Sequence, residues 1–470
     1  MRVQQFDFDV AILGGGSAGY AAARTAAAAG LTTAVIEGGR EVGGLCILRG
    51  CMPTKALLYA AEVLHRVRHP QPWGIRSGNV SFDFKRVMAR KDALIREFAE
   101  DRIRQLRAGP FRFIRAQAVF RDRHTLELKS PAGRRRGTIT ARHFIVATGS
   151  RVAPPPLPQL NQAGFLTSDQ AVELKKLPRS LLILGGGAVA CEFAQFFARF
   201  GVAVTLIQRS RQLLKEFDAD AAEAIETVFR REGLQVFTGT KLLDAQRKGK
   251  RKCVWFEHQG KTKSVSAEEI FFALGRIPHT AGLGLERAGV KTEADGRIIT
   301  DEFLQTSAPH IFAAGDCTGP HEIVHLAVQQ GEIAARNIAK PASARMDYRL
   351  LISIVFTDPQ VAFVGLTEKA AAANHLPFVT ASYPFNDHGK SLIMEARDGF
   401  VKLLADPQSG EILGGSCVGP AGGELIHEIV AAMARRMTVQ ELAAMPHYHP
   451  TLAEIWTYPA EELAGKIRAA

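Results

Sequence analysis

Two cysteines five positions apart are the residues of this chain with the clearest capacity for chemistry. Cys46 and Cys51 lie in the stretch 43–55, which reads GGLCILRGCMPTK. In a regular α-helix, residues five apart have Cα atoms roughly 8–9 Å from each other, whereas a disulfide needs about 4.4–6.8 Å. Gly50 relaxes the backbone and Pro53 removes the helix hydrogen bond to Arg49, so the helix can deform enough to close the bond. A strained, accessible disulfide is reducible and suits catalysis; two unrelated cysteines, one of them buried, are the alternative.

A dinucleotide-binding pattern precedes the cysteines. The apolar run 9–13 is typical of a buried parallel strand, and it leads into the glycines of a G-x-G-x-x-G loop, an alanine-rich helix and a second strand that ends at Glu37. The first glycine permits a tight turn, the second lets the backbone approach a pyrophosphate, and the third allows the helix to pack on the sheet. The helix N-terminus favours the phosphate charge, and we expect Glu37 to accept hydrogen bonds from a ribose. Glycines used only for turns are the alternative.

A second dinucleotide-binding pattern begins at Leu181. The strand 181–184 is followed by Gly185-x-Gly187-x-x-Ala190, a helix and the strand 202–207. Where an acidic residue would hold the ribose of NAD, this strand ends in Gln208-Arg209-Ser210-Arg211, with Lys215 close behind. A cationic cluster without the carboxylate favours a 2′-phosphate, and therefore NADPH over NADH. A solvated basic turn is the alternative.

The motif G-G-x-C-x3-G-C-x-P-x-K resembles the redox-active segment of the FAD-dependent pyridine nucleotide–disulfide oxidoreductases, which include dihydrolipoamide dehydrogenase, glutathione reductase and mercuric reductase. The resemblance implies an α/β fold with two Rossmann-like dinucleotide-binding domains, for FAD and NAD(P), and a C-terminal α+β dimerisation domain. The implied domains are 1–150 (FAD, first part), 151–272 (NAD(P)), 273–346 (FAD, returning part) and 347–470 (interface). Similar family segments extend the resemblance over nearly the whole chain, at 144–150, 271–278, 311–316, 419–426 and 447–454.

The same resemblance implies roles for the reactive side chains. Cys51 faces the flavin as a thiolate, and Cys46 is the outer thiol that exchanges with substrate. Lys55 pairs with Glu192 beside the flavin, although a solvated Glu192 is the alternative. His449 and Glu454 form an acid–base dyad that reaches the partner subunit's active site of a homodimer, and histidine suits this task because its ordinary pKa lies near neutrality.

Further residues are expected to bind the two cofactors. Asp316 would hydrogen-bond the ribityl chain, while His325 is expected mainly to pack or to contribute its backbone. For the region of His447 and His449, metal ligation, a packed histidine or a turn are the alternatives to the dyad, and no metal site is expected. The complete expected set is Gly14, Gly16, Gly19, Glu37, Gly44, Lys55, Thr148, Gly149, Gly185, Gly187, Arg209, Arg211, Gly275, Asp316, His325 and Ala327.

The expected reaction is hydride transfer from NADPH or NADH to FAD, then reduction of Cys46–Cys51 and of a disulfide substrate, as in dihydrolipoamide dehydrogenase. Gln208-Arg209 departs from that enzyme's usual acidic residue, and Leu45 and the segment 47–49 depart from the common redox motif. A mercuric reductase or another NADPH-dependent reductase of metals, quinones or small disulfides is the alternative. The sequence lacks the vicinal cysteine pair near the C-terminal end and the N-terminal CxxC module that a typical mercuric reductase carries. This argues against efficient reduction of Hg(II). A non-catalytic flavoprotein subunit or a redox-responsive binding protein is the alternative from another class.

Composition limits the remaining possibilities. A chain of 470 residues suggests about three domains, and no apolar run reaches the 18 or so residues that a membrane span needs. The net charge of +12 is largely due to arginine, but no nucleic-acid recognition motif accompanies it. Six cysteines are too few and too scattered for a disulfide framework, so Cys191, Cys253, Cys317 and Cys417 are expected to be structural. With no secretory signal in residues 1–9, we expect a cytoplasmic protein that binds neither membrane nor nucleic acid.

Overall fold

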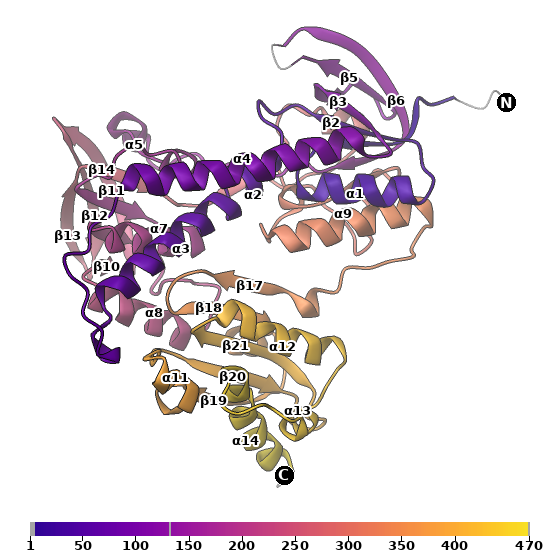
Figure 1. Ribbon diagram of the computed structural model, residues 1–470. Helices are drawn as coiled ribbons and strands as arrows, with labels where there is room; N and C mark the ends of the chain where they lie inside the picture. The colour runs from indigo at the N-terminus through magenta and orange to yellow at the C-terminus, as the bar shows by residue number, and fades with distance from the viewer. Residues whose placement is uncertain (1–4, 131–132, 469–470) are drawn as a thin grey trace. The chain divides into compact units, whose positions relative to one another are not determined.

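The computed structural model describes residues 5–130 and 133–468 (Figure 1), so the last two residues of the C-terminal end lie outside it. The chain divides into two compact units. Unit 1 comprises the described residues of 1–54, 89–154 and 275–346, and unit 2 comprises those of 55–88, 155–274 and 347–470. Two long helices belong to both units: α3 (Cys51–Arg68) and α4 (Phe84–Ala108). The domain boundaries expected from the sequence remain predictions.

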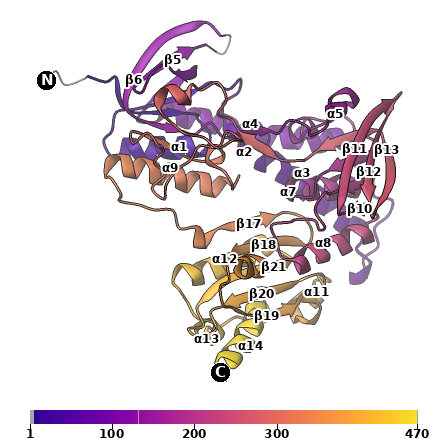
Figure 2. The same ribbon diagram turned by 180° about the vertical axis from the view of Figure 1, so that it is seen from behind.

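Unit 1 is built on a parallel sheet with strand order β3-β2-β1-β6, to which β16 is joined through β6 and which β5 and β4 extend in antiparallel fashion. Helices α1 and α9 run side by side (Figures 1 and 2). They approach so closely that a Cβ at Gly331 would lie 2.2 Å from the carbonyl oxygen of Ala18. The elements are β1 (Phe8–Leu13), α1 (Ser17–Ala28), β2 (Thr33–Glu37), α2 (Gly44–Leu48), β3 (Arg112–Arg115), β4 (Gln117–Phe120), β5 (Thr125–Lys129), β6 (Arg135–Val146), β7 (Ser150–Val152), β15 (Arg276–Pro278), η2 (Leu285–Ala288), β16 (Ile311–Ala313), η3 (Asp316–Thr318) and α9 (Val324–Ala339).

Unit 2 contains a second parallel sheet, of order β10-β9-β8-β14, and an antiparallel meander of β11, β12 and β13. Helix α7 (Ala188–Arg199) buries a row of phenylalanines, Phe193, Phe196 and Phe197, in the core. Their burial removes about 150–250 Å² of apolar surface per ring from water. This burial stabilises the packing of α7 against the core. The other elements of this part are η1 (Gln71–Trp73), α5 (Pro158–Ala163), α6 (Ser168–Ala171), β8 (Ser180–Leu184), β9 (Ala203–Ile207), α8 (Ala219–Arg231), β10 (Gln235–Phe237), β11 (Thr240–Lys248), β12 (Arg251–His258), β13 (Lys261–Ala267) and β14 (Glu269–Phe272).

The C-terminal part of unit 2 is a five-stranded antiparallel sheet of order β17-β18-β21-β20-β19. Its core holds the fully buried Trp456, whose ring nitrogen donates a hydrogen bond of 3.2 Å to the carbonyl of Leu425. Within the described residues, no helix combines the length and apolarity needed to cross a membrane. The elements are η4 (Tyr348–Leu350), β17 (Ile352–Val355), β18 (Gln360–Gly365), α10 (Glu368–Ala373), β19 (Val379–Pro384), η5 (Phe385–Asp387), α11 (Gly389–Ile393), β20 (Phe400–Ala405), β21 (Ile412–Gly419), α12 (Gly422–Ala434), α13 (Val439–Ala444), η6 (Ala453–Trp456) and α14 (Thr457–Arg468).

Candidate active site

The cysteine segment contains the helix interruption that its spacing requires. Helix α2 ends at Leu48 and α3 begins at Cys51, with Arg49 at φ −142° between them. Cys46 and Cys51 therefore lie on different helices, and both are half-buried. The turn is tight at Gly50, where a Cβ would lie 3.0 Å from the carbonyl oxygen of Leu45 and 3.2 Å from the Cα of Cys46. A side chain at this position would push the two short segments apart, which explains the need for glycine.

The first glycine loop closes tightly against the end of β6. Gly14 has φ +109°, and a Cβ there would lie 2.2 Å from the carbonyl oxygen of Ala147. A Cβ at Gly19 would lie 1.9 Å from the carbonyl oxygen of Gly14, so the turn and the first helix need glycine at both positions. The cysteine segment reaches the same loop, since a Cβ at Gly44 would lie 2.8 Å from the Cα of Gly16.

Glu37 holds the first glycine loop in place. One carboxylate oxygen accepts a hydrogen bond from the N–H of Gly15 at 2.9 Å, and the other accepts one from the N–H of Gly39 at 2.6 Å. Each oxygen of a carboxylate has more than one acceptor site. Glu37 can therefore keep these two bonds and still accept from a ribose hydroxyl.

A compact polar cluster joins the segment after β6 to the segment after β16. The hydroxyl of Ser150 donates to Asp316 Oδ2 at 2.7 Å, and Arg276 donates from Nε to that hydroxyl at 2.8 Å and from Nη2 to the Ser150 carbonyl at 2.9 Å. Beside it, the hydroxyl of Thr148 is buried and has no hydrogen-bond partner among the described residues.

The remaining residues expected near this cluster have simple local roles. Gly149 and Gly275 have φ of +70° and +109°, which favours glycine at both positions. His325 is half-buried in the first turn of α9. Ala327 is buried in the same helix, and a Cβ at Gly315, next to Asp316, would lie 3.4 Å from its side chain. Helix α9 is thus held close to the Asp316 segment by small residues.

The second glycine loop, in unit 2, repeats the arrangement of the first. Gly185 has φ +117°, and a Cβ there would lie 2.3 Å from the carbonyl oxygen of Ala273, whereas a Cβ at Gly187 would meet nothing within 4 Å. Gln208 is buried at the end of β9, and its side-chain oxygen accepts a hydrogen bond from the N–H of Arg209 at 3.0 Å. The side chains of Arg209 and Arg211 are exposed. This end of the strand therefore offers cations and a neutral amide, and no carboxylate.

Lys55 and Glu192 form an ion pair within unit 2. Lys55 Nζ lies 3.0 Å from Oε1 and 2.9 Å from Oε2 of Glu192, and 4.5 Å from the centre of the Phe356 ring. Oε1 of Glu192 also accepts a hydrogen bond of 3.0 Å from the N–H of Phe356. A cavity of about 190 Å³ lies beside this pair.

His449 and Glu454 are joined near the C-terminal end of the chain. The Nδ1 of His449 lies 2.9 Å from Oε2 of Glu454. The His449 side chain is 77% exposed, whereas that of Glu454 is only 10% exposed. His447 points elsewhere and pairs with Glu428 at 2.6 Å. Among the described residues, no group of three or more histidine, cysteine, aspartate or glutamate side chains could hold a metal ion.

Two family models match this chain. The one described as pyridine nucleotide-disulphide oxidoreductase matches residues 8–331, and the one described as the dimerisation domain of these oxidoreductases matches residues 351–460. The chain belongs to the pyridine nucleotide-disulphide oxidoreductase family. It is therefore an oxidoreductase and a flavoprotein with FAD-binding and nicotinamide-binding domains, as the sequence predicts, and its dimerisation domain indicates a homodimer.

Individual relatives support the same conclusion. The dihydrolipoyl dehydrogenase of Chlamydia muridarum is 35% identical over 96% of this chain and 96% of its own length. The mercuric reductase of Streptomyces lividans is 35% identical over 98% of this chain and 97% of its own length. Because the relatives include both enzymes, family membership does not decide between NADPH and NADH, nor does it identify the substrate.

Two solved structures have the same architecture. LpdA from Mycobacterium tuberculosis has a TM-score of 0.87 and 29% identity, covering 97% of this chain and 99% of its own. The Cu(II) complex of the HOCl-induced flavoprotein disulfide reductase RclA from Escherichia coli has a TM-score of 0.86 and 27% identity, covering 97% of this chain and all of its own. The predicted α/β class with two dinucleotide-binding domains and a dimerisation domain is confirmed.

The residues of unit 1 fit the FAD that the family binds. The glycine loop leaves no room for a Cβ at Gly14, and its backbone would lie close to the pyrophosphate of a bound dinucleotide. The Thr148 hydroxyl is buried without a partner among the described residues, and Asp316 stands at the end of a strand of the same sheet. These are the donors, acceptors and close approach that a bound dinucleotide needs.

Sequence reasoning missed a cationic side chain whose charge interacts with that of Cys46. Arg102 of α4 lies over the ring of Tyr20, with its guanidinium carbon 4.2 Å from the ring centre, and Arg24 lies 5.1 Å from the same ring. Burial lowers the pKa of Arg102, while the charges of Tyr20 and Cys46 oppose this shift. Its Nε has no hydrogen-bond partner among the described residues. No sequence signal distinguished Arg102, because α4 carries many arginines and has the composition of a solvent-exposed helix.

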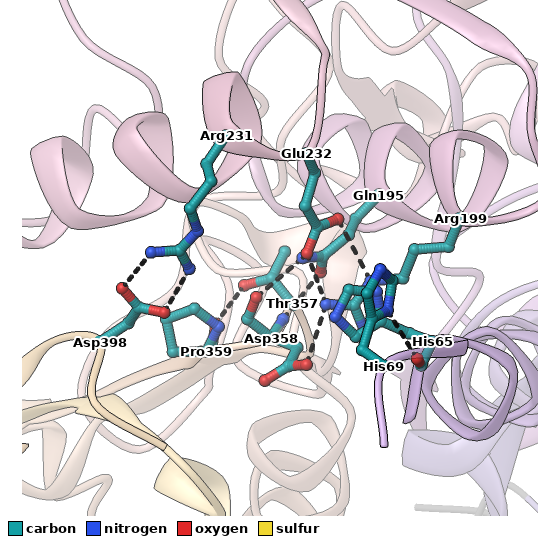
Figure 3. Close-up of polar contacts among 10 residues, drawn as sticks. All are labelled: His65, His69, Gln195, Arg199, Arg231, Glu232, Thr357, Asp358, Pro359 and Asp398. Atoms are coloured by element: carbon teal, nitrogen blue, oxygen red, sulfur yellow. Dashed lines mark hydrogen bonds and ion pairs between the residues drawn. The ribbon is translucent and has the colours of Figure 1, made fainter. Parts of the chain in front are cut away.

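Sequence reasoning also missed the buried polar network that supports Glu192 (Figure 3). Two turns along α7, Arg199 donates to Glu232 at 2.6 Å and to Asp358 at 2.9 Å. Gln195, between them, donates to the carbonyl of Asp358 and accepts from its N–H, both at 2.7 Å. Burial opposes the charge of Arg199, but the bonds to Glu232 and Asp358 outweigh it and raise its pKa. One face of α7 thus fixes the segment whose Phe356 N–H reaches Glu192.

Proposed function

We propose that this protein transfers electrons from NADPH to a small disulfide substrate through Cys46 and Cys51, in the manner of a dihydrolipoamide dehydrogenase. The observation that supports this most directly is the helix break between the two cysteines. It places two half-buried thiols on two helices, Cys46 in α2 and Cys51 at the start of α3, which meet at Gly50. This turn lies next to the glycine loop of unit 1.

The reaction needs each cysteine to have a separate role. When bound, FAD accepts a hydride from the nicotinamide cofactor and supplies two electrons to a disulfide. In the reduced protein the Cys46 thiolate attacks one sulfur of the substrate disulfide, which forms a mixed disulfide and releases the first substrate thiol. Cys51 then attacks the sulfur of Cys46, which releases the second thiol and restores the Cys46–Cys51 bond. The positive charge of Arg102 supports the thiolate form of Cys46.

Protons for the leaving thiols come, in this proposal, from the His449–Glu454 dyad. Because the His449 side chain is 77% exposed, it is available to the active site of a second subunit in the homodimer. Glu454 accepts from Nδ1 of His449, so the other ring nitrogen is the one that gives and takes the proton. The carboxylate holds the ring and stabilises its charged form.

The preference for NADPH rests on the end of β9. Gln208 occupies the place where an acidic residue would bind the ribose of NAD, and Arg209 and Arg211 next to it are exposed cations. A 2′-phosphate would gain two charge-assisted contacts there and meet no carboxylate. We further infer that the protein works in a reducing cytoplasm, where a catalytic cysteine pair can cycle.

A turnover panel tests the proposed function. Wild type and Cys46→Ser are compared with lipoamide, glutathione disulfide, a quinone, Hg(II) and oxygen as acceptors and NADPH as donor. Turnover of a disulfide that Cys46→Ser abolishes supports the proposal. Turnover confined to quinone, Hg(II) or oxygen and unaffected by the substitution indicates another reductase, and no turnover at all indicates a binding protein; either result contradicts the proposal.

A further inference from the structure

A buried histidine with no role in the reaction described above lies against the dyad. His388, just before α11, has no exposed surface, and its Nε2 lies 3.4 Å from Oε1 of Glu454. Its Nδ1 lies 2.7 Å from the hydroxyl of Ser391, which is also fully buried. Glu454 is therefore flanked by two histidines: the exposed His449 at one carboxylate oxygen and the buried His388 at the other.

The partners of His388 determine where its hydrogen lies. Nε2 lies 3.4 Å from Oε1 of Glu454, an atom that can only accept, and it forms no hydrogen bond among the described residues. Nε2 must therefore carry the hydrogen. Ser391 can donate its hydroxyl hydrogen to Nδ1, which completes the neutral ring. Burial lowers the pKa of His388, against the opposing charge of Glu454, which favours the neutral ring.

We propose that His388 is a positioning residue of the His449–Glu454 dyad, in which Ser391 sets its tautomer and its Nε2–H, 3.4 Å from the second oxygen of Glu454, stabilises the charge on that oxygen. The proposal rests on the proposed role of the dyad in proton transfer. A carboxylate that is only 10% exposed needs donors in place of water. His388 places its Nε2 3.4 Å from Oε1, while Oε2 is directed at the ring of His449.

This arrangement predicts how tightly the dyad holds its proton. A neutral donor at Oε1 stabilises the ionised carboxylate and takes up part of its negative charge. Without that donor, the negative charge of the carboxylate is less stabilised, and it attracts the proton shared with His449 more strongly. The dyad then holds the proton more tightly, and its titration moves to higher pH. A hydrogen bond to a charged group is strong enough to move such a titration by about one pH unit.

Three other titratable side chains lie near His388, and each has a contact other than the carboxylate of Glu454. The ring of Tyr458 lies edge-on to His388, with centroids 6.3 Å apart. Asp387, the preceding residue, accepts a hydrogen bond of 3.0 Å from the hydroxyl of Tyr383. Burial and this bond raise the pKa of Tyr383 to about 12, so Tyr383 does not change its charge between pH 5 and 9.

The test measures the titration of His449 itself. The FAD-loaded protein is labelled with ¹⁵N-histidine, the signal of His449 is assigned with His449→Gln, and its titration midpoint is compared in His388→Leu and His388→Gln. Leucine removes the donor, and we expect the midpoint to rise by about one pH unit. The amide of glutamine can place a donor where Nε2 lies, and we expect a change below about 0.3 unit. An unchanged midpoint in the leucine variant, or an equal rise in both variants, overturns the proposal.

Ser391→Ala keeps the test decisive if the leucine variant does not fold. Loss of the hydroxyl frees His388 to adopt the other tautomer, so we expect a smaller rise, on the order of half a pH unit. No rise in this variant overturns the proposal. The same spectra of the wild type must also show Nδ1 of His388 without a hydrogen. A failure of the proposed function is distinguishable, because His449→Gln would then leave disulfide turnover unchanged whatever the titration shows.

Discussion

Lys55 and Glu192, 137 residues apart in sequence, form an ion pair of 2.9 Å in which the two partners differ in exposure. The carboxylate is 4% exposed and the lysine side chain 33% exposed. Besides Lys55, Glu192 accepts one hydrogen bond from the backbone N–H of Phe356. The lysine therefore supplies the neutralising charge for a buried carboxylate.

Loss of Lys55 should destabilise the protein. In Lys55→Met a nearly buried carboxylate loses its counter-charge, and we expect the free energy of unfolding to fall by about 2 kcal/mol, discounted for the partial exposure of the lysine. Thermal unfolding of the FAD-loaded protein measures this. Lys466→Met, which breaks the exposed pair with Glu462, is the matched control and should cost less than about 0.5 kcal/mol. Equal effects of the two substitutions would show that Glu192 does not depend on Lys55.

Stability should fall in weak acid because of His65. Burial, reinforced by the charge of Arg199, lowers its pKa to about 4, below the unfolded value near 6.5. The unfolded chain then binds the proton more tightly. The stability contributed by neutral His65 is complete above pH 6.5 and is lost as the pH falls towards 4, by at most about 3 kcal/mol.

The pH dependence of unfolding in His65→Phe tests this assignment. The substitution should flatten the decline between pH 6.5 and 4. His69→Phe, at the exposed histidine whose ring centre lies 4.4 Å away, should leave the decline unchanged. If the two variants give the same curve as the wild type, the acid sensitivity has another source.

Arg102 should make Cys46 more reactive. Its guanidinium is close enough for the charge of Cys46 to act on it, and a nearby cation stabilises a thiolate. In Arg102→Leu we expect the pKa of the Cys46 thiol to rise, seen as a shift to higher pH in the pH dependence of iodoacetamide labelling in the reduced protein. Arg104→Leu, on the same helix but paired with Asp101 at the surface, is the control. A shift of equal size in both variants contradicts a specific role for Arg102.

The cationic end of β9 should select NADPH. Arg209→Glu removes a cation and introduces a carboxylate, so we expect the ratio of kcat/KM for NADPH to that for NADH to fall by at least about tenfold, since a charge-assisted contact contributes roughly 1.5–3 kcal/mol. Arg247→Glu makes the same change of charge on the β11–β12 hairpin and controls for net charge. An unchanged ratio in Arg209→Glu would rule out a phosphate site at this position.

Local patterns in the sequence predicted most of the scaffold. The glycine loops, the strands on either side of them and the break between Cys46 and Cys51 follow from backbone rules that act over a few residues. The predicted pairings of Lys55 with Glu192 and of His449 with Glu454 are present, although their catalytic roles remain proposals. Both pairings came from resemblance to a family. For Lys55 and Glu192 no local pattern could have indicated the pair, since the two residues are 137 positions apart.

The contacts that the sequence did not reveal join distant segments through ordinary residue types. His388 lies 66 positions before Glu454 and Arg102 lies 56 after Cys46, so only the folded chain brings each pair together. Arg199 has the sequence appearance of a helix-terminal cation, yet it is nearly buried between Glu232 and Asp358. Burial and partner cannot be predicted for such residues without knowing which elements pack together.

The central claim is that electrons leave through the two cysteines of the 43–55 segment. Anaerobic reduction with one equivalent of NADPH, followed by iodoacetamide and peptide mass spectrometry, tests it directly. We expect reduction to make Cys46 and Cys51 newly reactive, with Cys46 labelled faster, and to leave Cys253 and the buried cysteines unchanged. Oxidation of NADPH while neither Cys46 nor Cys51 gains label would contradict electron transfer through these cysteines.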